Sequence, residues 1–243
     1  MNNFFLKIKK PLSYIKKRAT HLYQKIIKIK EIKKYNIIDI ENYSNTFVFA
    51  KGFDKDSVLI DVGCAEDADL SVEMIKRYAL SCYGVDPTKK HFPALKELEV
   101  SLNNHFKHLP YAIGANNTEL TFYESVDNQS GSLKNDHINV RNDHINQYQV
   151  QCVTIQKLIE MNNIHSVDYF KLDIEGAEYD LIEKLEQKDL ANIKQLFIEF
   201  HHRHLPDYTI NDTKKSVKKV ESLGFESFTF DKRNYLFLNQ KHL

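Results

Sequence analysis

Short apolar runs alternate with amphipathic segments along most of the chain after residue 57. Four of these runs predict buried strands: SVLIDVG (57–63), SCYGVDP (81–87), SVDYFKLD (166–173) and IKQLFIEFH (193–201). Helices are expected between and after them, at 68–79, 89–102, 155–162, 176–186 and 214–225. Strands that alternate with helices are typical of a mostly parallel α/β sheet with helices on both faces. The last run, SFTFDKRNYLFLN (227–239), predicts an antiparallel C-terminal hairpin with its turn near Arg233.

The middle of the chain is less regular. Further strands are expected at 107–115, 119–125 and 148–155. Between the last two, the polar stretch 130–146 has no periodicity and contains NDHIN twice, at 135–139 and 142–146. Five residues are too few for a structural repeat. We expect a long loop that can serve as a lid.

The N-terminal segment differs in charge from the rest. Residues 1–35 contain 11 of the 34 Lys and Arg residues and one acid, Glu31. Residues 36–243 carry 23 Lys and Arg against 32 Asp and Glu, a formal charge of −9. Apolar residues at helical spacing predict a basic helical extension, and 36–57 is expected to be a connecting segment. The predicted domains are therefore residues 1–57, the extension and linker, and residues 58–243.

Two interpretations of the basic arm remain open. It is either a solvated helix that packs on the domain or a peripheral contact with an anionic membrane or an acidic partner. No apolar run approaches the roughly 20 residues that a membrane-spanning helix needs. The three cysteines are too scattered for a disulfide framework, so a reducing cytoplasm is the expected compartment. An oligomer is compatible with the sequence.

Acidic residues end four of the predicted strands: Asp61, Asp86, Asp173 and Glu199. In an open parallel sheet, ligands bind beyond the carboxyl ends of the strands. Carboxylates that gather there repel one another unless a cation or a set of hydroxyl donors lies among them. S-adenosylmethionine supplies a sulfonium, an ammonium and two ribose hydroxyls. A divalent metal ion, Mg²⁺ or Mn²⁺, is the less favoured alternative.

Each acid also has a structural explanation. Asp61 and Gly63 form a D-x-G sequence, which marks either a nucleotide-binding loop or a simple turn. Asp86 either accepts hydrogen bonds from ribose hydroxyls or caps the helix that follows. Asp173 is expected to face the ligand crevice, and Lys171 on the same strand face is expected to pair with it. Glu175 and Glu178 either face a ligand or cap the next helix.

A run of histidines follows the predicted strand at 193–201. Strand alternation sends Glu199 and His201 to one face and His202 and His204 to the other. Zinc is disfavoured because no other cysteine or histidine has metal-ligand spacing. Asp173 with Glu199 is the alternative Mg²⁺ or Mn²⁺ set. The candidates for a general base are Asp173, Glu199, His201 and the loop residues His137 and His144.

The sequence resembles FkbM-family methyltransferases. VDYFKLDIEGAEYDLIEKL resembles their V-D-F-I-K-I-D-V-E-G-A-E segment, and VLIDVGCAEDADLSV resembles their D-V-G-A-N loop. GVDPTKKHFPAL, AIGANNTELTFYES with SGSL, VQCVTIQKL and IEFHHRH match later family segments in the same order. The resemblance spans roughly residues 56–240 and omits the basic arm. The family's D-x-G-A-N-x-G reads D-V-G-C-A-E-D here, so the Asn is missing and Asp67 stands where the second glycine is common. Asp at a tight turn can adopt a left-handed conformation, which would keep the geometry of the loop.

The resemblance implies a class I, Rossmann-like fold with seven strands and methyl transfer from S-adenosylmethionine to a hydroxyl. Asp61, Gly63 and Cys64 would belong to the cofactor loop, Asp86 would bind the ribose, and Asp173 would face the methionine end or the acceptor. The leading hypothesis is O-methylation of a carbohydrate, with Asp173, Glu199 and His201 as catalytic candidates. A nucleic-acid methyltransferase, disfavoured by the acidic body, and a non-catalytic binding protein are the alternatives.

Overall fold

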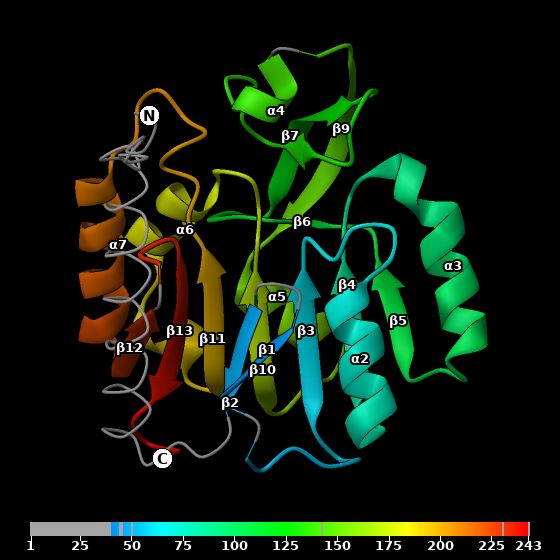
Figure 1. Ribbon diagram of the computed structural model, residues 1–243, viewed down its shortest axis with the longest axis vertical. Coiled ribbons are helices and arrows are strands. Elements are labelled where there is room, and N and C mark those ends of the chain that lie inside the picture. The colour runs from blue at the N-terminus through cyan, green and yellow to red at the C-terminus, as the bar shows by residue number, and fades with distance from the viewer. Residues whose placement is uncertain (1–39, 44–45, 50, 142, 230, 243) are drawn as a thin grey trace, which may run out of the picture. The chain divides into compact units, whose positions relative to one another are not determined.

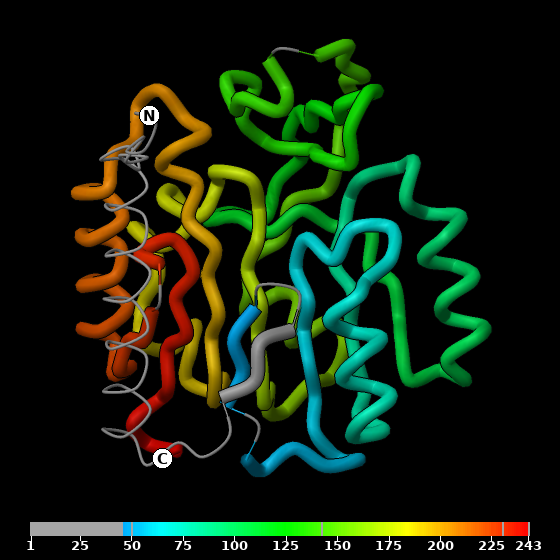
Figure 2. Tube along the Cα trace, viewed as in Figure 1, coloured from blue at the N-terminus to red at the C-terminus, as the bar shows by residue number. Residues whose placement is uncertain are grey.

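The computed structural model describes residues 40–43, 46–49, 51–141, 143–229 and 231–242. The predicted basic helical arm, residues 1–35, lies outside the described residues. Figure 1 shows the arrangement of helices and strands, and Figure 2 shows the path of the chain. None of the described helices is long and apolar enough to cross a membrane.

A seven-stranded sheet forms the centre of the domain (Figure 1). Its strands, in spatial order, are β12 (Phe225–Thr229), β13 (Asn234–Asn239), β11 (Ile193–Glu199), β10 (Val167–Leu172), β3 (Val58–Val62), β4 (Ser81–Val85) and β5 (Phe106–Leu109). β13 runs antiparallel to both of its neighbours, β11 and β12, and the remaining pairs of neighbouring strands are parallel. The predicted sheet and C-terminal hairpin are confirmed. The hairpin forms one edge of the sheet, with β13 paired to β11 and β12 outermost.

Helices pack on the faces and ends of this sheet. They are α2 (Asp69–Tyr78), α3 (Phe92–Ser101), α5 (Ile155–Met161), α6 (Glu178–Lys184) and α7 (Ile210–Ser222), with 3-10 turns η1 (Lys89–His91) and η2 (Gln187–Leu190). In Figure 1, α2 lies in front of the sheet, and α5 and α6 lie behind it. Covered on both faces, the central strand β10 is buried at every position, including the polar Asp168 and Lys171.

A second, four-stranded sheet lies beyond the carboxyl ends of β3, β4 and β10 (Figure 1). Its order is β6 (Ala112–Ile113), β9 (Ile145–Val153), β7 (Thr118–Ser125) and β8 (Gly131–Ser132), with the short α4 (Ile138–Arg141) beside it. The expected single strand 107–115 is therefore wrong, because the chain breaks around Pro110 and enters two sheets. The predicted loop 130–146 contains β8, α4 and the start of β9.

The expected connecting segment 36–57 contains a two-stranded hairpin, β1 (Ile40–Tyr43) with β2 (Thr46–Phe49). Phe47 and Val48 are buried, and the Tyr169 hydroxyl donates a hydrogen bond to the Phe47 carbonyl at 2.7 Å. Gln195 bonds both the N–H and the carbonyl of Phe49. Residues 46–49 are thus part of the folded domain and not a linker.

Candidate active site

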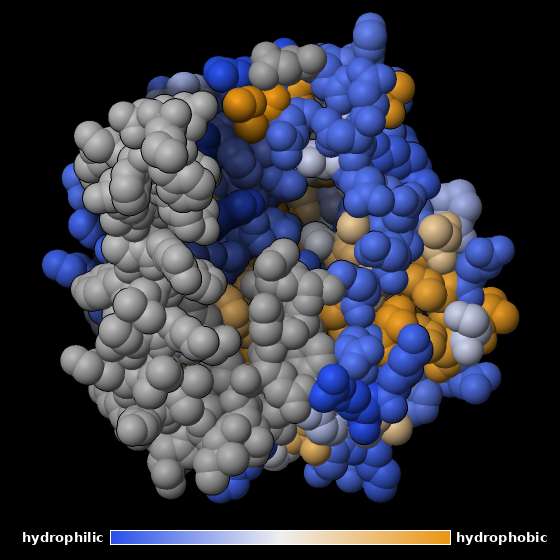
Figure 3. All heavy atoms as spheres, in the orientation of Figure 1, coloured by the Kyte–Doolittle hydropathy of each residue, from blue (hydrophilic) through white to orange (hydrophobic). Residues whose placement is uncertain are grey.

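A cavity of about 220 Å³ lies between the carboxyl edge of the main sheet and the second sheet. Residues from the ends of β3, β4 and β10 line one side, among them Gly63, Asp86 and Asp173. Phe122, Gly131 and Leu133 close it from the second sheet. In Figure 3 the surface is hollowed above the carboxyl ends of β3 and β4. This is where the strand order predicts a ligand.

The loop after β3 requires glycine at position 63. Gly63 has a positive φ of 75°, and a Cβ atom there would lie 1.9 Å from the backbone oxygen of Asp173. Its N–H donates to the Val85 carbonyl at 2.9 Å, so the loop is fixed between β4 and β10. The backbone at the cavity floor therefore carries no side chain that could block a ligand.

The left-handed residues that follow are Ala65, with φ 57°, and Ala68, with φ 42°. Asp67 does not use the left-handed conformation that was open to it: it is exposed and does not have a positive φ. Ala65 occupies the position of the family's Asn, a residue that tolerates left-handed backbone. Its N–H donates to Asp86 Oδ2 at 3.0 Å, which joins the loop to the end of β4.

Asp61 does not line the cavity, contrary to its predicted cofactor contact. It is 1% exposed, pairs with Lys171 (Oδ1 to Nζ, 3.1 Å) and accepts a hydrogen bond from the Ser71 hydroxyl at 2.7 Å. Lys171 Nζ also donates to the Gly63 carbonyl at 3.0 Å. Lys171 was expected to pair with Asp173, but the structure pairs it with Asp61. Burial opposes the charge on Lys171, but Asp61 and Asp173 outweigh it and raise the pKa of the ammonium group.

Asp86 is buried and lines the cavity. It accepts hydrogen bonds from the N–H of Thr88 at 2.8 Å and contacts His91 Nδ1 at 3.2 Å. Burial raises the pKa of this carboxyl, but the bonds from His91 and Thr88 outweigh it and leave the pKa below its ordinary value. Asp86 is therefore an anion at the cavity wall, where the ribose was predicted to bind.

His91, which sequence reasoning missed, lies beside Asp86. The ring is 1% exposed and lines the cavity, and its Nε2 is buried without a hydrogen-bond partner among the described residues. An unpaired buried polar atom costs about 1–3 kcal/mol. A ligand that bonds to Nε2 would remove that cost. Nothing in the local sequence marks His91, because the segment KKHFPAL reads as an ordinary helix start.

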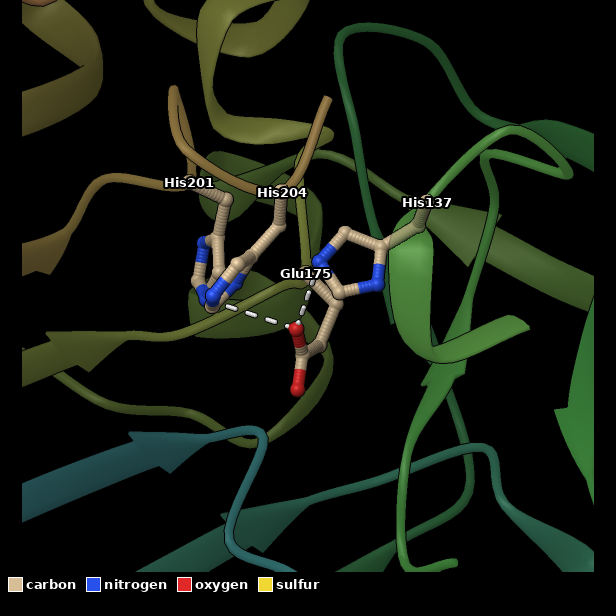
Figure 4. Close-up of side chains that lie close together, drawn as sticks. All are labelled: His137, Glu175, His201 and His204. Atoms are coloured by element: carbon tan, nitrogen blue, oxygen red, sulfur yellow. Dashed lines mark ion pairs between the residues drawn. The ribbon is translucent and has the colours of Figure 1, made fainter. Parts of the chain in front are cut away.

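A cluster of carboxylates and imidazoles lies next to the cavity, where β10 and β11 end. We call it the acid–histidine cluster: His137, Asp173, Glu175, Glu199, His201 and His204. Asp173 and Glu175 also line the cavity. His201 Nε2 is 3.4 Å from both Asp173 Oδ1 and Glu175 Oε2. Figure 4 shows His137, His201 and His204 converging on the Glu175 carboxylate.

Charges within the cluster shift one another's protonation. Burial, together with the Glu199 carboxylate, raises the pKa of Asp173 to about 7. For His201, burial opposes the charge, yet Glu178 and Asp173 outweigh it and raise the pKa to about 10. For Glu175, burial is outweighed by His137 and His201, which lower the pKa to about 2. Groups shifted in this way beside a cavity are typical of active sites.

A family model for the methyltransferase FkbM domain matches residues 61–227. The matched segment is more than half of the 243-residue chain. The chain belongs to the FkbM methyltransferase family. It is an S-adenosylmethionine-dependent methyltransferase, and the predicted family, enzyme class and cofactor are confirmed.

Solved structures resemble this FkbM domain only in broad outline. A fibrillarin pre-rRNA processing protein of Methanococcus jannaschii is 12% identical over 76% of this chain and 66% of its own, with a TM-score of 0.44. An rRNA methylase of Streptococcus thermophilus is 10% identical over 77% and 88%, with a TM-score of 0.42. Aeropyrum pernix fibrillarin with natively bound S-adenosyl-L-methionine is 9% identical over 76% and 66%, with a TM-score of 0.42. These similarities are too low to inform on the acceptor. No curated protein matches the sequence.

The FkbM domain does not place its histidines as strand alternation predicts. β11 ends at Glu199, and the chain then turns, with the His204 N–H bonded to the His201 carbonyl. His201 and His204 therefore lie on the same side, with ring centroids 5.7 Å apart. His202 points away and contacts the Thr213 hydroxyl at 3.0 Å. The pattern fails because alternation holds only while the strand continues.

The two loop histidines have opposite environments. His137 is fully buried and its Nε2 lies 3.0 Å from Glu175 Oε2. His144 is exposed and pairs with Asp127 at 3.1 Å, away from the cavity. The Ile138 N–H donates to the His204 carbonyl, and the Ser132 hydroxyl donates to the Glu175 carbonyl. Residues 130–141 thus form a wall of the FkbM site.

The remaining predicted site residues are also placed. Cys64 is buried and does not line the cavity, and burial raises the pKa of its thiol well above the ordinary value. Glu199 pairs with Arg233. Glu178 is 0% exposed and accepts the N–H groups of Gly176 and His201, both at 2.8 Å. Glu178 therefore supports the turn before α6 from inside and faces neither solvent nor the cavity.

Proposed function

We propose that this enzyme methylates a hydroxyl of a carbohydrate, a sugar of a bacterial surface polysaccharide or its activated precursor. The observation that supports this most is the group Asp173, Glu175 and His201 beside the cavity. Carboxylates and imidazoles are hydrogen-bond partners for a neutral polyol. Asp173 also has a pKa of about 7, suited to accepting a hydroxyl proton near neutral pH.

The cavity fits the methyl donor by its own features. Gly63 leaves the backbone open, Asp86 presents an anion at the wall, and His91 Nε2 is a buried polar atom without a partner. We assign ribose binding to Asp86 and His91, and close backbone contact to Gly63. When bound, S-adenosylmethionine supplies an electrophilic methyl group on a sulfonium.

Asp173 is our candidate for the general base. The acceptor hydroxyl would give its proton to an Asp173 carboxylate oxygen while the hydroxyl oxygen forms its bond to the methyl carbon. Glu175 and His201 would hold the acceptor in line, and such alignment is a main source of rate in methyl transfer. Glu199, paired with Arg233, would position that arginine and so shape the cluster.

RNA is the second acceptor class to test. The formal charge of −9 on residues 36–243 and the acidic cluster disfavour a polyanion at this site. The basic arm, 11 Lys and Arg with one acid in residues 1–35, would contact an anionic membrane or an acidic partner. Three buried free thiols suit a reducing cytoplasm.

Two measurements test the proposal. Calorimetry with S-adenosylmethionine should show binding, and its absence would favour the non-catalytic alternative. Incubation with a panel of activated sugars should give S-adenosylhomocysteine and a product heavier by one CH2. If only oligonucleotides are methylated, the carbohydrate proposal is wrong.

Asp173→Asn should reduce turnover by roughly 10²–10⁴-fold and leave cofactor affinity within about twofold. The exposed Asp56→Asn is the control.

A further inference from the structure

Three histidines and one glutamate converge from separate segments of the chain. His137 comes from the second sheet's connection, Glu175 from the turn after β10, and His201 and His204 from the turn after β11. One ligand atom from each lies within 4.8 Å of the other three (Figure 4). His137 and His201 are buried, and Glu175 and His204 are partly exposed. Three imidazoles and a carboxylate are a donor set for transition metals.

The atoms that face one another lack other partners. His137 Nε2, Glu175 Oε2 and His204 Nδ1 are buried and have no hydrogen-bond partner among the described residues. The His137–Glu175 contact is close at 3.0 Å but is not aligned as a hydrogen bond. Each such orphaned atom is costly in a folded protein. A bound ion would satisfy all of them at once.

The surrounding groups orient these ligands. His201 Nδ1 lies 3.3 Å from Glu178 Oε1, which leaves Nε2 directed at Asp173 and Glu175. A carboxylate behind a histidine is the usual support for a metal ligand. Glu175 takes a strained left-handed backbone, with φ 48°, and Ser130 and Ser132 bond its carboxylate and its carbonyl. The Asn139 N–H donates a long hydrogen bond of 3.4 Å to His137 Nδ1. Metal binding at Nε2 would leave the ring proton on Nδ1, and this long hydrogen bond would then be lost.

The charge balance also favours a cation. Asp61 is paired with Lys171, and Glu199 with Arg233. Asp173, Glu175 and Glu178 have no lysine or arginine in an ion pair among the described residues. Three carboxylates around three imidazoles need protons or a metal ion for neutrality. The alternative set of Asp173, Glu199 and His201 is weaker, because Arg233 already neutralises Glu199.

We propose that His137, Glu175, His201 and His204 bind one divalent transition-metal ion of the zinc type. Imidazole ligands favour Zn²⁺ over the hard ions Mg²⁺ and Ca²⁺, which prefer oxygen. The sequence disfavoured zinc because His137 is far from His201 and His204 along the chain, and only folding brings them together. Zinc would displace any proton from these rings, because imidazole binds metal in its neutral form.

The site also bears on the acceptor. Glu175 belongs both to the metal set and to the cavity wall. A metal ion there would polarise an acceptor hydroxyl and make it easier to deprotonate. This second step rests on the proposed function, whereas metal binding itself does not.

Direct binding measurements test the site. The tag-free full chain is stripped with EDTA, dialysed and titrated with Zn²⁺ by calorimetry, with metal content checked by mass spectrometry. We expect one Zn²⁺ per chain and much weaker binding of Mg²⁺. His137→Ala and His204→Ala should each weaken Zn²⁺ binding by about tenfold or more, and Glu178→Gln should weaken it by about tenfold.

Two histidine variants serve as controls. His165→Ala changes an exposed residue before β10, at the opposite end of that strand, and should bind Zn²⁺ as the wild type does. His144→Ala removes one possible ligand from the exposed group Asp127, Asp143 and His144. It therefore shows whether Zn²⁺ binds to that group or to the acid–histidine cluster. Three results would each overturn the site. The first is wild-type Zn²⁺ affinity in both His137→Ala and His204→Ala, the second is loss of Zn²⁺ binding in His144→Ala, and the third is tight Mg²⁺ binding without Zn²⁺ binding.

Failure of the proposed function would give a different result. Calorimetry with S-adenosylmethionine in EDTA tests the cofactor cavity without the metal. Methyl transfer to activated sugars is then measured with and without added Zn²⁺. Loss of Zn²⁺ binding with intact cofactor binding rejects the metal site alone, and Zn²⁺ binding without sugar methylation rejects the acceptor proposal alone.

Discussion

Removing either partner of the buried Asp61–Lys171 pair should destabilise the whole domain and not only weaken cofactor binding. Asp61 is 1% exposed and Lys171 is nearly as buried, and their charged atoms are 3.1 Å apart. Asp61→Asn keeps the shape and the Ser71 contact but leaves the Lys171 ammonium without its counterion. Breaking one side of a buried pair costs about 3–5 kcal/mol.

That cost is large for a domain of this size. At roughly 2–4 °C per kcal/mol, the melting temperature of Asp61→Asn should fall by about 6–20 °C. Lys171→Met should behave similarly, since it strands the Asp61 carboxylate and removes the hydrogen bond to the Gly63 carbonyl. The double variant removes both charges, so its loss should fall short of the sum by about 1–3 kcal/mol.

Urea unfolding of the cofactor-free chain, followed by far-ultraviolet circular dichroism, measures the free energy of unfolding of each variant. Asp67→Asn is the matched control, because Asp67 lies in the same loop but is exposed, and it should change stability by less than about 0.5 kcal/mol. If Asp61→Asn unfolds at the wild-type urea concentration and only loses affinity for S-adenosylmethionine, Asp61 is a cofactor ligand and our reasoning is wrong.

Further predictions concern the cofactor loop and the thiols. Gly63→Ala should destabilise by more than about 2 kcal/mol, because its Cβ would clash with the Asp173 carbonyl at 1.9 Å; unchanged thermal melting would contradict this. Ala65→Asn should raise the melting temperature by about 1–4 °C, because Asn tolerates the φ of 57° better than Ala; a fall would refute the strain argument. His91→Phe should weaken S-adenosylmethionine binding by roughly tenfold in calorimetry, with Asp86→Ala as the positive control; equal affinity would exclude His91 from the site. Burial raises the pKa of all three thiols, that of Cys152 to about 11, so a thiol reagent in mildly alkaline buffer should label them only after denaturation; rapid labelling of the native chain would contradict the buried positions.

The order of apolar and polar residues was sufficient to predict the main sheet, and contiguous motifs were sufficient to indicate the family. Strand–helix alternation is set by short-range periodicity, and parallel strands must end at one edge, so the acids of that edge could be expected to surround a ligand. Asp86 and Asp173 do line the cavity. The second sheet was not predicted as a separate unit, because whether neighbouring strands share a sheet depends on pairing partners distant in the sequence.

The position of each acid relative to the end of its strand decides which of them lines the cavity. Asp86 follows the last residue of β4, whereas Asp61 is still inside β3, one residue before its end. Asp61 pairs with Gly84 of β4, two residues before Asp86, so strand alternation gives the two acids the same face. They differ in depth: Asp61 lies among Ser71 and Lys171 inside the sheet layer, whereas Asp86 lies beyond the strand end and lines the cavity. Strand ends are uncertain by a residue or two from sequence alone, so the two acids looked equivalent there.

The duplicated NDHIN shows what only the tertiary structure decides. The first copy places His137 in the acid–histidine cluster, fully buried, and the second leaves His144 with 88% of its side chain exposed. The five letters are identical, so the difference comes entirely from what packs against them: the His204 turn and Glu175 in one case, solvent in the other. The sequence by itself determined the sheet, the edge and the methyl donor, because these follow from local periodicity and contiguous motifs. The grouping of His137, Glu175, His201 and His204 depends on contacts between distant segments, which the linear pattern does not encode.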